Sequence, residues 1–483
     1  MLRLIIHNHK CQLTGDLMVV EEIREAINFK IRVKNAYFAM MKSPGGWDGF
    51  RRFISPTGLF GTGLLPEVAA WLKQNELDYE VIDKRSLFKE MGTVTKLEGF
   101  EERDYQADAV KALVNNKLDL GGGVKIRYQR GILWEATNAG KNLIAACLFL
   151  SFSSKRKGLF LINNQTIFEQ AVEELRELMG KDVVGFVSSK KVDWKRVNVC
   201  MVQTLANRIK THKQIRKDVE GADIIIVDES DEVISRKDTQ KIFAAAWNCP
   251  IRIGLTGTQG LSKDKIKNKE SIEYLGPVLH RTRNQDLVDK GHSAKPIISV
   301  HEGNTKVLVD ADYSEELEKG IIRNTKRNKK VWLRAKHHLK KGRKNVLILF
   351  KYHRHAKYLE ASMPKWFKEN GYKVAYIHGK NKNREEMLKK FKEGKINVLV
   401  CSMIVRRGKN LPSMRALINA AGGDSHSNLL QILGRALRKK LSGPNKVHID
   451  DFMDMGKYLR RHSKHRITYY KNEGFPVKEV YKK

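Results

Sequence analysis

Two series of short apolar runs alternate with amphipathic segments along most of this 483-residue chain, and this alternation constrains its fold most. The first series, starting near residue 98, comprises GILWEAT, GLFLINN, VNVCMVQT, ADIIIVDES and IRIGLTGT; the second, starting near residue 344, comprises NVLILF, KVAYIHG, INVLVCS, RALINAA and KVHIDDF. Such runs are typical of strands buried on both faces of a parallel sheet, with helices as the connections. We therefore predict two α/β domains with parallel sheets.

The first hundred residues have a different pattern. PEVAAWLKQNEL has a proline at its start and apolar residues three and four apart, which predicts a helix, and YEVID predicts a strand. IREAINFKIRVKN and YFAMMK alternate apolar and charged residues as short strands do. We predict four segments: a small α+β module at 1–97, a first α/β domain at 98–290, a connection with a basic helix at 291–343, and a second α/β domain at 344–483.

The charge balance indicates the kind of partner. Lys and Arg number 91 against 54 for Asp and Glu, which gives a net charge of +37 spread along the chain. A field of this sign favours a polyanion, and nucleic acid is the usual one. The five cysteines are far apart, which fits a reducing cytosol better than a zinc site or a disulfide framework. Because no apolar run is long enough to span a membrane, we expect a cytoplasmic protein with no membrane partner.

A candidate phosphate-binding loop lies in WEATNAGKN. Gly140 and Lys141 stand where such a loop ends and a helix begins, so backbone N–H groups could hold phosphate oxygens while Lys141 neutralises their charge. Two positions depart from the usual pattern. Glu135 replaces its first glycine, and Asn142 stands where a serine or threonine hydroxyl normally binds magnesium.

Two further motifs complete a candidate nucleotide site. The run IIIVDESDE brings Asp228 and Glu229 to the end of a strand, where the aspartate can hold magnesium and the glutamate can orient an attacking water. In LLQILGRALRKK, Arg435 and Arg438 lie three residues apart, and on a helix they would share one face. An arginine that reaches a γ-phosphate stabilises the charge of the transition state.

These motifs, in this order, resemble those of the superfamily-two helicases over about residues 98–450. The resemblance implies two tandem RecA-like domains that use ATP and Mg²⁺, with Lys141, Asp228, Glu229, Arg435 and Arg438 as catalytic residues and Asn142 and Asp228 near the metal. It implies nucleotide-binding residues at Arg103, Tyr105, Gln106, Thr137, Asn138, Ala139, Gly140, Lys141, Asn142, Gly408, Asn410 and Gln431. It also implies nucleic-acid contacts at Asn164, Gln203, Thr204, His378, Gly379 and Ser402, and coupling hydroxyls at Thr256 and Thr258.

Within that superfamily the chain is similar to phage UvsW-type recombination helicases. The similarity lies in GWDGFRRFISPTGLFGTGLLPEVAAWL, QDLVDKGHSAKP and EELEKGIIRNTKRNKKV. It implies a monomeric DNA translocase that remodels forks and Holliday junctions with little sequence preference, in the host cytoplasm if the gene is a phage gene. Two alternatives stay open. The DESD tetrapeptide suggests an RNA helicase of the DEAD-box kind, and Asn142 suggests a nucleic-acid-binding scaffold that no longer hydrolyses ATP.

Asn142 is the departure with a chemical consequence. An amide oxygen is a weaker ligand than a well-placed hydroxyl for an octahedral ion such as Mg²⁺. The sequence therefore predicts weaker binding of magnesium-nucleotide or slower turnover. Natural divergence and a substitution introduced to trap the enzyme both explain this residue equally.

Two basic stretches lie outside these motifs. RNTKRNKKVWLRAKHHLKKGRK gathers cations around Trp332, His337 and His338, and RRHSKHRITYYKN gathers them near Tyr469 and Tyr470. Each stretch suits either contact with a nucleic-acid backbone or a solvated helix face. The two tyrosines could stack on bases or could close the core of the second domain.

Overall fold

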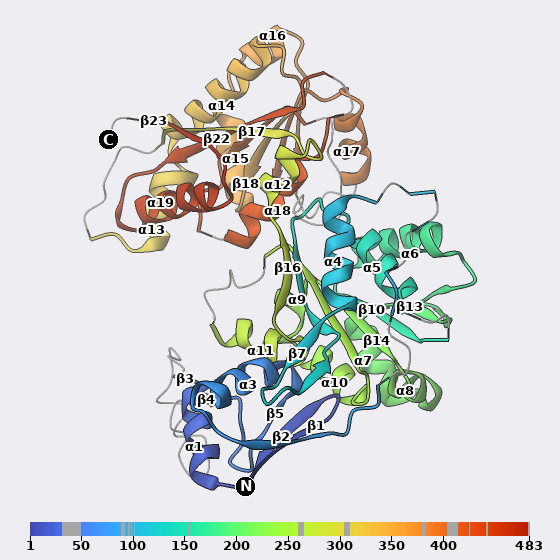
Figure 1. The fold of residues 1–483 in the computed structure, drawn as a ribbon. Coiled ribbons are helices and arrows are strands. Elements are labelled where there is room, and N and C mark those ends of the chain that lie inside the picture. Colours follow the sequence, from blue (N-terminus) through green and yellow to red (C-terminus); the bar gives the residue numbers. More distant parts are fainter. Residues whose placement is uncertain are drawn as a thin grey trace. The chain divides into compact units, whose positions relative to one another are not determined.

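In the computed structural model, the chain forms two compact units (Figure 1). Unit 1 contains Met1–Glu135 and Ala139–Arg281, and unit 2 contains Ala136–Asn138 and Thr282–Lys483. The structure describes all residues of the chain except 31–49, 88–91, 95–96, 98, 101, 153–154, 259–264, 304–309, 379–382, 403–413, 425, 441–442 and 482–483.

Unit 1 is built on an eight-stranded sheet in the order β12-β11-β13-β10-β14-β15-β9-β16. The registers between β11, β13, β10, β14, β15 and β9 are all parallel, and β12 pairs with β11 in the antiparallel direction. The strands are β9 (Arg130–Glu135), β10 (Gly158–Ile162), β11 (Val184–Val187), β12 (Val192–Asp193), β13 (Val197–Met201), β14 (Ile224–Asp228), β15 (Ile251–Thr256) and β16 (Val278–Thr282). All five apolar runs of the first series are therefore parallel strands, as predicted.

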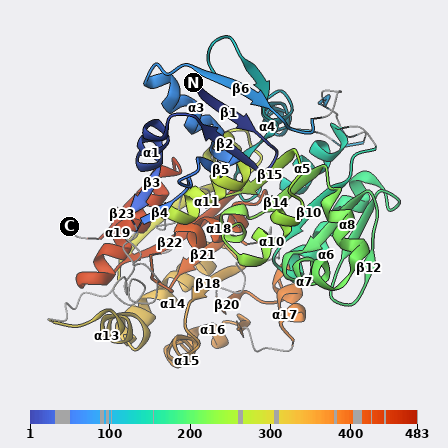
Figure 2. The same ribbon diagram turned by 90° about the horizontal axis from the view of Figure 1, so that it is seen from below.

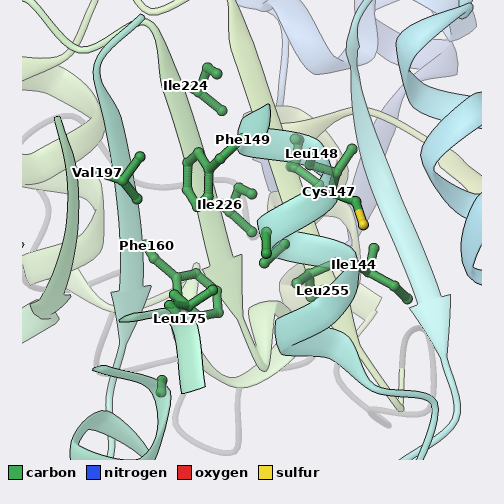
Figure 3. Close-up of a cluster of buried hydrophobic side chains, with 14 of the residues drawn as sticks. Ile144, Cys147, Leu148, Phe149, Phe160, Leu175, Val197, Ile224, Ile226 and Leu255 are labelled. Atoms are coloured by element: carbon green, nitrogen blue, oxygen red, sulfur yellow. The ribbon is translucent and has the colours of Figure 1, made fainter. Parts of the chain in front are cut away.

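Helices cover both faces of this sheet because alternate strand residues point to opposite sides. On one face, Phe160 and Ile226 pack with the almost entirely apolar α5 (Figure 3). On the other face, Leu159 and Ile225 pack with α7, α8 and α10. The helices of this unit beyond the N-terminal module are α4 (Asp104–Val114), α5 (Lys141–Leu150), α6 (Gln165–Met179), α7 (Val202–Thr211), α8 (Lys213–Glu220), α9 (Ser230–Val233), α10 (Lys237–Ala245) and α11 (Lys265–Leu275).

The N-terminal residues form a smaller sheet in the order β5-β2-β1-β6, with β1 central (Figures 1 and 2). The predicted helix and strand are present as α3 (Leu65–Gln74) and β6 (Tyr79–Asp83), but the expectation of a strand at IREA is wrong. These residues end helix α1, whose Val20 and Ile23 face the core of the module. YFAMMK lies outside the described residues. The other elements are β1 (Leu2–Ile6), β2 (Lys10–Thr14), α1 (Leu17–Ala26), β3 (Asn28–Lys30), β4 (Phe50–Arg52), β5 (Leu59–Gly61) and the short η1 (Thr62–Leu64).

Within unit 1, the N-terminal sheet is attached to the eight-stranded sheet at the amino ends of β9 and β15. Arg130 Nη1 donates to the carbonyl of Asn8 at 3.0 Å, and Arg252 Nη1 lies 3.0 Å from His9 Nδ1. Both arginines are buried and are neighbours across the two strands. The core of the module also includes Tyr128, which follows the hairpin β7 (Lys117–Asp119) and β8 (Lys125–Arg127). The module is therefore joined to the edge of the sheet opposite its carboxyl ends.

Unit 2 contains seven strands in the order β19-β20-β18-β21-β22-β17-β23, and every register is parallel. The second series of apolar runs supplies five of them: β18 (Val346–Phe350), β19 (Val374–Ile377), β20 (Val398–Ser402), β21 (Ala416–Asn419) and β22 (Lys446–Met453). The expectation that residues 291–343 only connect two domains is wrong, because β17 (Lys295–Glu302) is an inner strand of this sheet. The last strand is β23 (Val477–Val480).

The helices of unit 2 include the predicted basic helix, α14 (Thr325–Lys340). Its Trp332 is fully buried against Phe367, which assigns this tryptophan to the core. The other helices are α12 (Asn284–Asp289), α13 (Tyr313–Leu317), the π-helical turn η2 (Glu318–Ile322), α15 (His353–Ala361), α16 (Trp366–Glu369), α17 (Arg384–Lys392), α18 (His426–Ala436) and α19 (Lys457–Asn472). None of the helices in the described part of the chain combines the length and apolar character needed to cross a lipid bilayer.

Candidate nucleotide site

The candidate phosphate loop joins β9 to α5, as its sequence predicts. Gly140 precedes the helix with φ 79° and ψ 48°, a left-handed conformation that favours glycine. A Cβ at this position would lie 2.5 Å from Gln106 Nε2, so any larger residue would displace the Gln106 amide. Lys141 opens the helix, and the N–H groups of the first turn of α5 lie at the carboxyl end of the sheet.

Lys141 forms a buried cluster with the two acidic residues at the end of β14. Its Nζ lies 2.9 Å from Glu229 Oε1 and 3.4 Å from Asp228 Oδ1. Burial opposes the charge of Lys141, but Glu229 and then Asp228 outweigh it and hold the lysine pKa above its usual range. Burial raises the pKa of Asp228, and Lys141 offsets this only in part. Glu229 is therefore the main counter-ion of the lysine.

Glu229 is held in an unusual conformation. Its φ of 48° is one of four positive values among the described non-glycine residues. A side chain in this left-handed region carries backbone strain, and such strain is common at functional sites. The turn at Glu229 starts the short helix α9 directly after the strand, which brings Glu229 Oε1 to Lys141.

The predicted coupling hydroxyls meet at a residue to which the sequence assigned no role. Thr256 Oγ1 donates to Asp231 Oδ1 at 2.5 Å, and Thr258 Oγ1 donates to Asp231 Oδ2 at 2.6 Å. Burial, followed by the neighbouring Glu229, raises the pKa of Asp231. The fourth residue of DESD therefore joins the acidic turn to the carboxyl end of β15.

The predicted nucleotide-binding residues Arg103, Tyr105 and Gln106 lie directly behind the loop. Gln106 Nε2 and Tyr105 Oη both donate to the carbonyl of Ala139, at 2.7 and 3.0 Å. The Gln106 side-chain oxygen accepts from the backbone N–H of Arg103 at 3.0 Å, and the Arg103 guanidinium donates to Tyr105 Oη at 3.0 Å. These hydrogen bonds join α4 to the residue that precedes Gly140. They place all three predicted residues beside the loop.

Asn142 has a partner that its sequence context does not reveal. Its Nδ2 donates to Glu174 Oε2 on α6 at 2.6 Å, and Gln170 Nε2 donates to the other oxygen of the same carboxylate. The amide is therefore oriented by α6, with its nitrogen occupied. This contact connects residues 32 positions apart, so no local pattern could have predicted it.

Glu135, the residue in place of the first glycine of the loop, is fully buried. Its Oε1 lies 2.6 Å from His280 Nδ1 on β16, and this hydrogen bond raises the pKa of His280. No donor in the described part of the chain reaches its Oε2. The next residue along β16, Arg281, stacks 3.9 Å from the ring centroid of Trp134. Sequence reasoning missed both partners because they lie about 145 residues away.

The nucleic-acid residues predicted in unit 1 share one edge of the sheet. Asn164 follows β10 and accepts a hydrogen bond from Ile167 N at 3.3 Å at the start of α6. Gln203 and Thr204 follow β13 in the first turn of α7, and Gln203 is exposed. Because β10 and β13 are parallel neighbours, the three side chains come from the same carboxyl edge.

Unit 2 contains the remaining predicted residues. His378 follows β19 and packs its ring 4.2 Å from that of His353, while Ser402 ends β20. Gln431 and Arg435 lie on α18, but Arg438 lies beyond its end and pairs with Ser293 in a β-bridge, so the expected shared helix face is wrong. Thr137 and Asn138 group with this unit, where Asn138 Nδ2 lies 3.4 Å from Ser293 Oγ. Three predicted residues lie outside the described residues: Gly379, Gly408 and Asn410.

Two family patterns match the chain. "Type III restriction enzyme, res subunit" matches residues 99–260, and "Helicase conserved C-terminal domain" matches residues 325–440. Both matches lie on the two parallel-sheet units. The first covers the loop, the acidic turn and the coupling threonines, and the second covers Arg435 and Arg438.

Proteins of similar sequence are also helicases or translocases. The "Putative ATP-dependent helicase IRC3" of Saccharomyces cerevisiae is 26% identical over 73% of this chain and 51% of its own length. The "DNA 3'-5' translocase XPB2" of Sulfurisphaera tokodaii is 24% identical over 70% of this chain and 79% of its own. The "ATP-dependent RNA helicase DBP3" of Saccharomyces cerevisiae is 30% identical over 30% of this chain and 28% of its own. The chain thus spans about half the length of the yeast helicase IRC3.

Solved structures share the fold. A fragment of a putative HsdR subunit of a type I restriction enzyme from Vibrio vulnificus YJ016 superimposes with a TM-score of 0.54 at 18% identity, over 78% of this chain and 68% of that one. The T4 UvsW structure aligns over 99% of both chains at 20% identity with a TM-score of 0.46.

Proposed function

We propose that this chain, a member of the superfamily-two helicases with two tandem RecA-like units, is an ATP-driven motor that remodels branched DNA. The observation that carries the proposal is the buried cluster of Lys141 with Asp228 and Glu229, beside a glycine loop at the carboxyl ends of parallel strands. Such an edge is where nucleotides bind in open α/β sheets.

In this proposal the loop and the first turn of α5 hold the phosphates of ATP, and Lys141 exchanges its contact with Glu229 for the β- and γ-phosphates. A carboxylate that loses this lysine becomes available to orient the attacking water, which is the role we assign to Glu229. Gln106, fixed by Arg103 and Ala139, is positioned to contact the adenine base. Thr256 and Thr258 sense the acidic turn through Asp231.

The acidic turn has the chemistry that a magnesium ion requires. Asp228 Oδ1 has only the lysine, 3.4 Å away, as an ion-pair partner, and no donor among the described residues reaches the buried Oε2 of Glu229. Carboxylate oxygens are preferred ligands of Mg²⁺, which supplies charge neutralisation of the phosphates. Asn142 fits less well, because its amide nitrogen is held by Glu174 and only its oxygen is left to face a metal.

DNA is the proposed track. The charge of +37 supports a polyanionic partner that is held through phosphates, with little sequence preference and a steep dependence on salt. The XPB2 relative, a DNA translocase matched over 79% of its length, favours DNA. We propose that Arg435 and Arg438 act when the two RecA-like domains close on ATP, and that closure and reopening move a monomer along a DNA arm toward a fork or Holliday junction in the cytoplasm.

An RNA track is the second candidate, favoured by the RNA helicase DBP3 and by DESD. The deciding assay measures ATP turnover with forked DNA, Holliday junctions, linear duplex, single-stranded DNA and RNA. We expect branched DNA to stimulate turnover most. Stimulation by RNA alone would overturn the DNA proposal.

Substitutions at Asn142 can distinguish an active motor from a nucleic-acid-binding scaffold that does not hydrolyse ATP. We expect wild-type turnover to be slow, Asn142→Thr to be faster, and Lys141→Ala to be inactive on every nucleic acid. If neither the wild type nor Asn142→Thr hydrolyses ATP under any condition while both bind DNA, the motor proposal is refuted and the protein is a nucleic-acid-binding scaffold. Asn142→Gln is the matched control, because it keeps an amide and supplies no hydroxyl.

A further inference from the structure

Helix α19 lies near the end of unit 2 in the sequence and is labelled in Figure 1. Its two faces differ in burial and in how their charges are paired. Its inner face is packed and neutralised: Arg466 donates to Asp451 from Nε and Nη2, each at 2.9 Å, and Tyr470 Oη donates to the same carboxylate at 2.8 Å. Tyr470 is therefore part of the core and is not available to stack on bases. These contacts hold α19 rigidly against β22.

The outer face of α19 is a row of exposed cations. Lys457, Arg460, Arg461 and Lys464 recur at helical spacing, and the helix sequence KYLRRHSKHRITYYKN contains no acidic residue. None of these four side chains forms an ion pair with a carboxylate in the part of the chain that the structure describes. At about 1.5 Å per residue the row extends roughly 10 Å, a length over which one DNA strand presents about three phosphates.

A hollow of about 600 Å³ lies along this row. It is lined by Met455, Gly456, Lys457, Arg460, Arg461, Lys464 and His465, so no carboxylate faces into it. The backbone N–H groups at the start of α19 are already occupied by the buried carboxylate of Glu316, at 2.7 to 3.1 Å. An anion in the hollow would therefore be held by side-chain cations. The space exceeds what a single ion needs, because cavities of ~300–1,000 Å³ hold organic molecules.

Helix α14, the other basic helix of unit 2, has cations that form ion pairs with carboxylates. It has the same length as α19, yet Lys330 pairs with Glu302 at 2.8 Å and Arg334 pairs with Asp450 at 2.9 Å. Its exposed lysines, Lys326, Lys329 and Lys340, are spread over 15 residues. The concentrated, unneutralised charge on α19 costs self-repulsion that a bound polyanion would remove.

We propose that the outer face of α19 and its hollow form a binding site for the sugar–phosphate backbone of a nucleic acid. The site lies outside every helicase motif of the chain. It rests on the proposed function for the identity of its ligand, a DNA arm, which it would hold in addition to the strand-end residues.

The test compares two triple variants of the full-length protein. Arg460→Gln, Arg461→Gln, Lys464→Gln removes three cations of α19, and Lys326→Gln, Lys329→Gln, Lys340→Gln removes three exposed lysines of α14 with the same change in net charge. Affinity for a fluorescent forked DNA is measured without ATP between 50 and 200 mM salt. Each lost phosphate contact lowers the salt slope by about 0.9, so wild-type affinity should fall roughly 40-fold more over this range than that of the α19 variant.

For the α14 variant, the slope of log affinity against log salt concentration should differ from that of the wild type by no more than about 0.9, the value of one phosphate contact. Equal slopes for the two triple variants, or a wild-type slope for the α19 variant, would overturn the proposal. The single Arg461→Gln, with a slope reduced by about 1, provides the same test if the triple variant folds poorly by circular dichroism. If DNA stimulates turnover but the α19 variant keeps the wild-type salt slope, the α19 site is refuted and the proposed motor function stands. If the α19 variant has a reduced salt slope but the wild type hydrolyses no ATP with any nucleic acid, the motor function is refuted and the α19 site stands.

Discussion

Replacing Lys141 with methionine should reveal how much the candidate nucleotide site contributes to stability. The side chains of Lys141, Asp228 and Glu229 are 14%, 8% and 24% exposed, so the substitution leaves two carboxylates largely buried with no counter-ion. Removal of one member of a buried ion pair costs about 3–5 kcal/mol, and the partial exposure of Glu229 places this case near 3 kcal/mol. The raised lysine pKa means that the contribution is fully present at neutral pH and is lost only above the usual lysine range.

The assay is urea unfolding at pH 7.5, followed by circular dichroism. The triple variant Lys141→Met, Asp228→Asn, Glu229→Gln removes all three charges and should lie within about 1 kcal/mol of the wild type. Lys111→Met is the surface control, because its partner Asp108 is 3.8 Å away and both side chains are more than half exposed. The reasoning is refuted if Lys141→Met costs no more than this control, or if the triple variant is as unstable as the single one.

Two further predictions concern unit 1. Burial raises the pKa of Glu273 from 4.5 to about 7 although Arg51 lies 4.0 Å away, so stability should fall as pH rises from about 4.5 to 7 and level off above it; Glu273→Gln should be nearly neutral at pH 4 and stabilising by up to about 3 kcal/mol at pH 8, measured by urea unfolding at both values. Gly140→Ala should displace the Gln106 amide and raise the KM for ATP by an order of magnitude, whereas Gly180→Ala, which shares a positive φ but meets open space, should cost only about 1–2 kcal/mol of stability and leave KM unchanged.

The sequence predicted the strands well where the signal is local. Continuous apolar runs identify buried parallel strands, and polar residues directly after them must meet at the carboxyl edge of the sheet. This reasoning was enough to bring Lys141 and Glu229, 88 positions apart, into one site. Gln106 was predicted from the resemblance to the superfamily-two helicases, and its Nε2 lies 2.7 Å from the carbonyl of Ala139 in the loop.

The errors came where a residue's role depends on distant partners. β17 was missed because its KPIISVHE alternates apolar and polar residues, and only its place between β22 and β23 makes it an inner strand. Arg438 was expected on a helix, but α18 ends at Ala436 and Arg438 pairs with Ser293 instead. The arginine spacing alone could not show where the helix ends.

The sequence by itself determined the two α/β domains, the order of their strands along the chain and the types of residue at the candidate nucleotide site, because these depend on short-range hydrophobic pattern and on motif spacing. Only the tertiary structure decided that Asn142 is held by Glu174, that Glu135 pairs with His280, and that two basic helices differ in how far their charge is neutralised. Those properties depend on which side chains from distant segments meet, and neither composition nor periodicity carries that information.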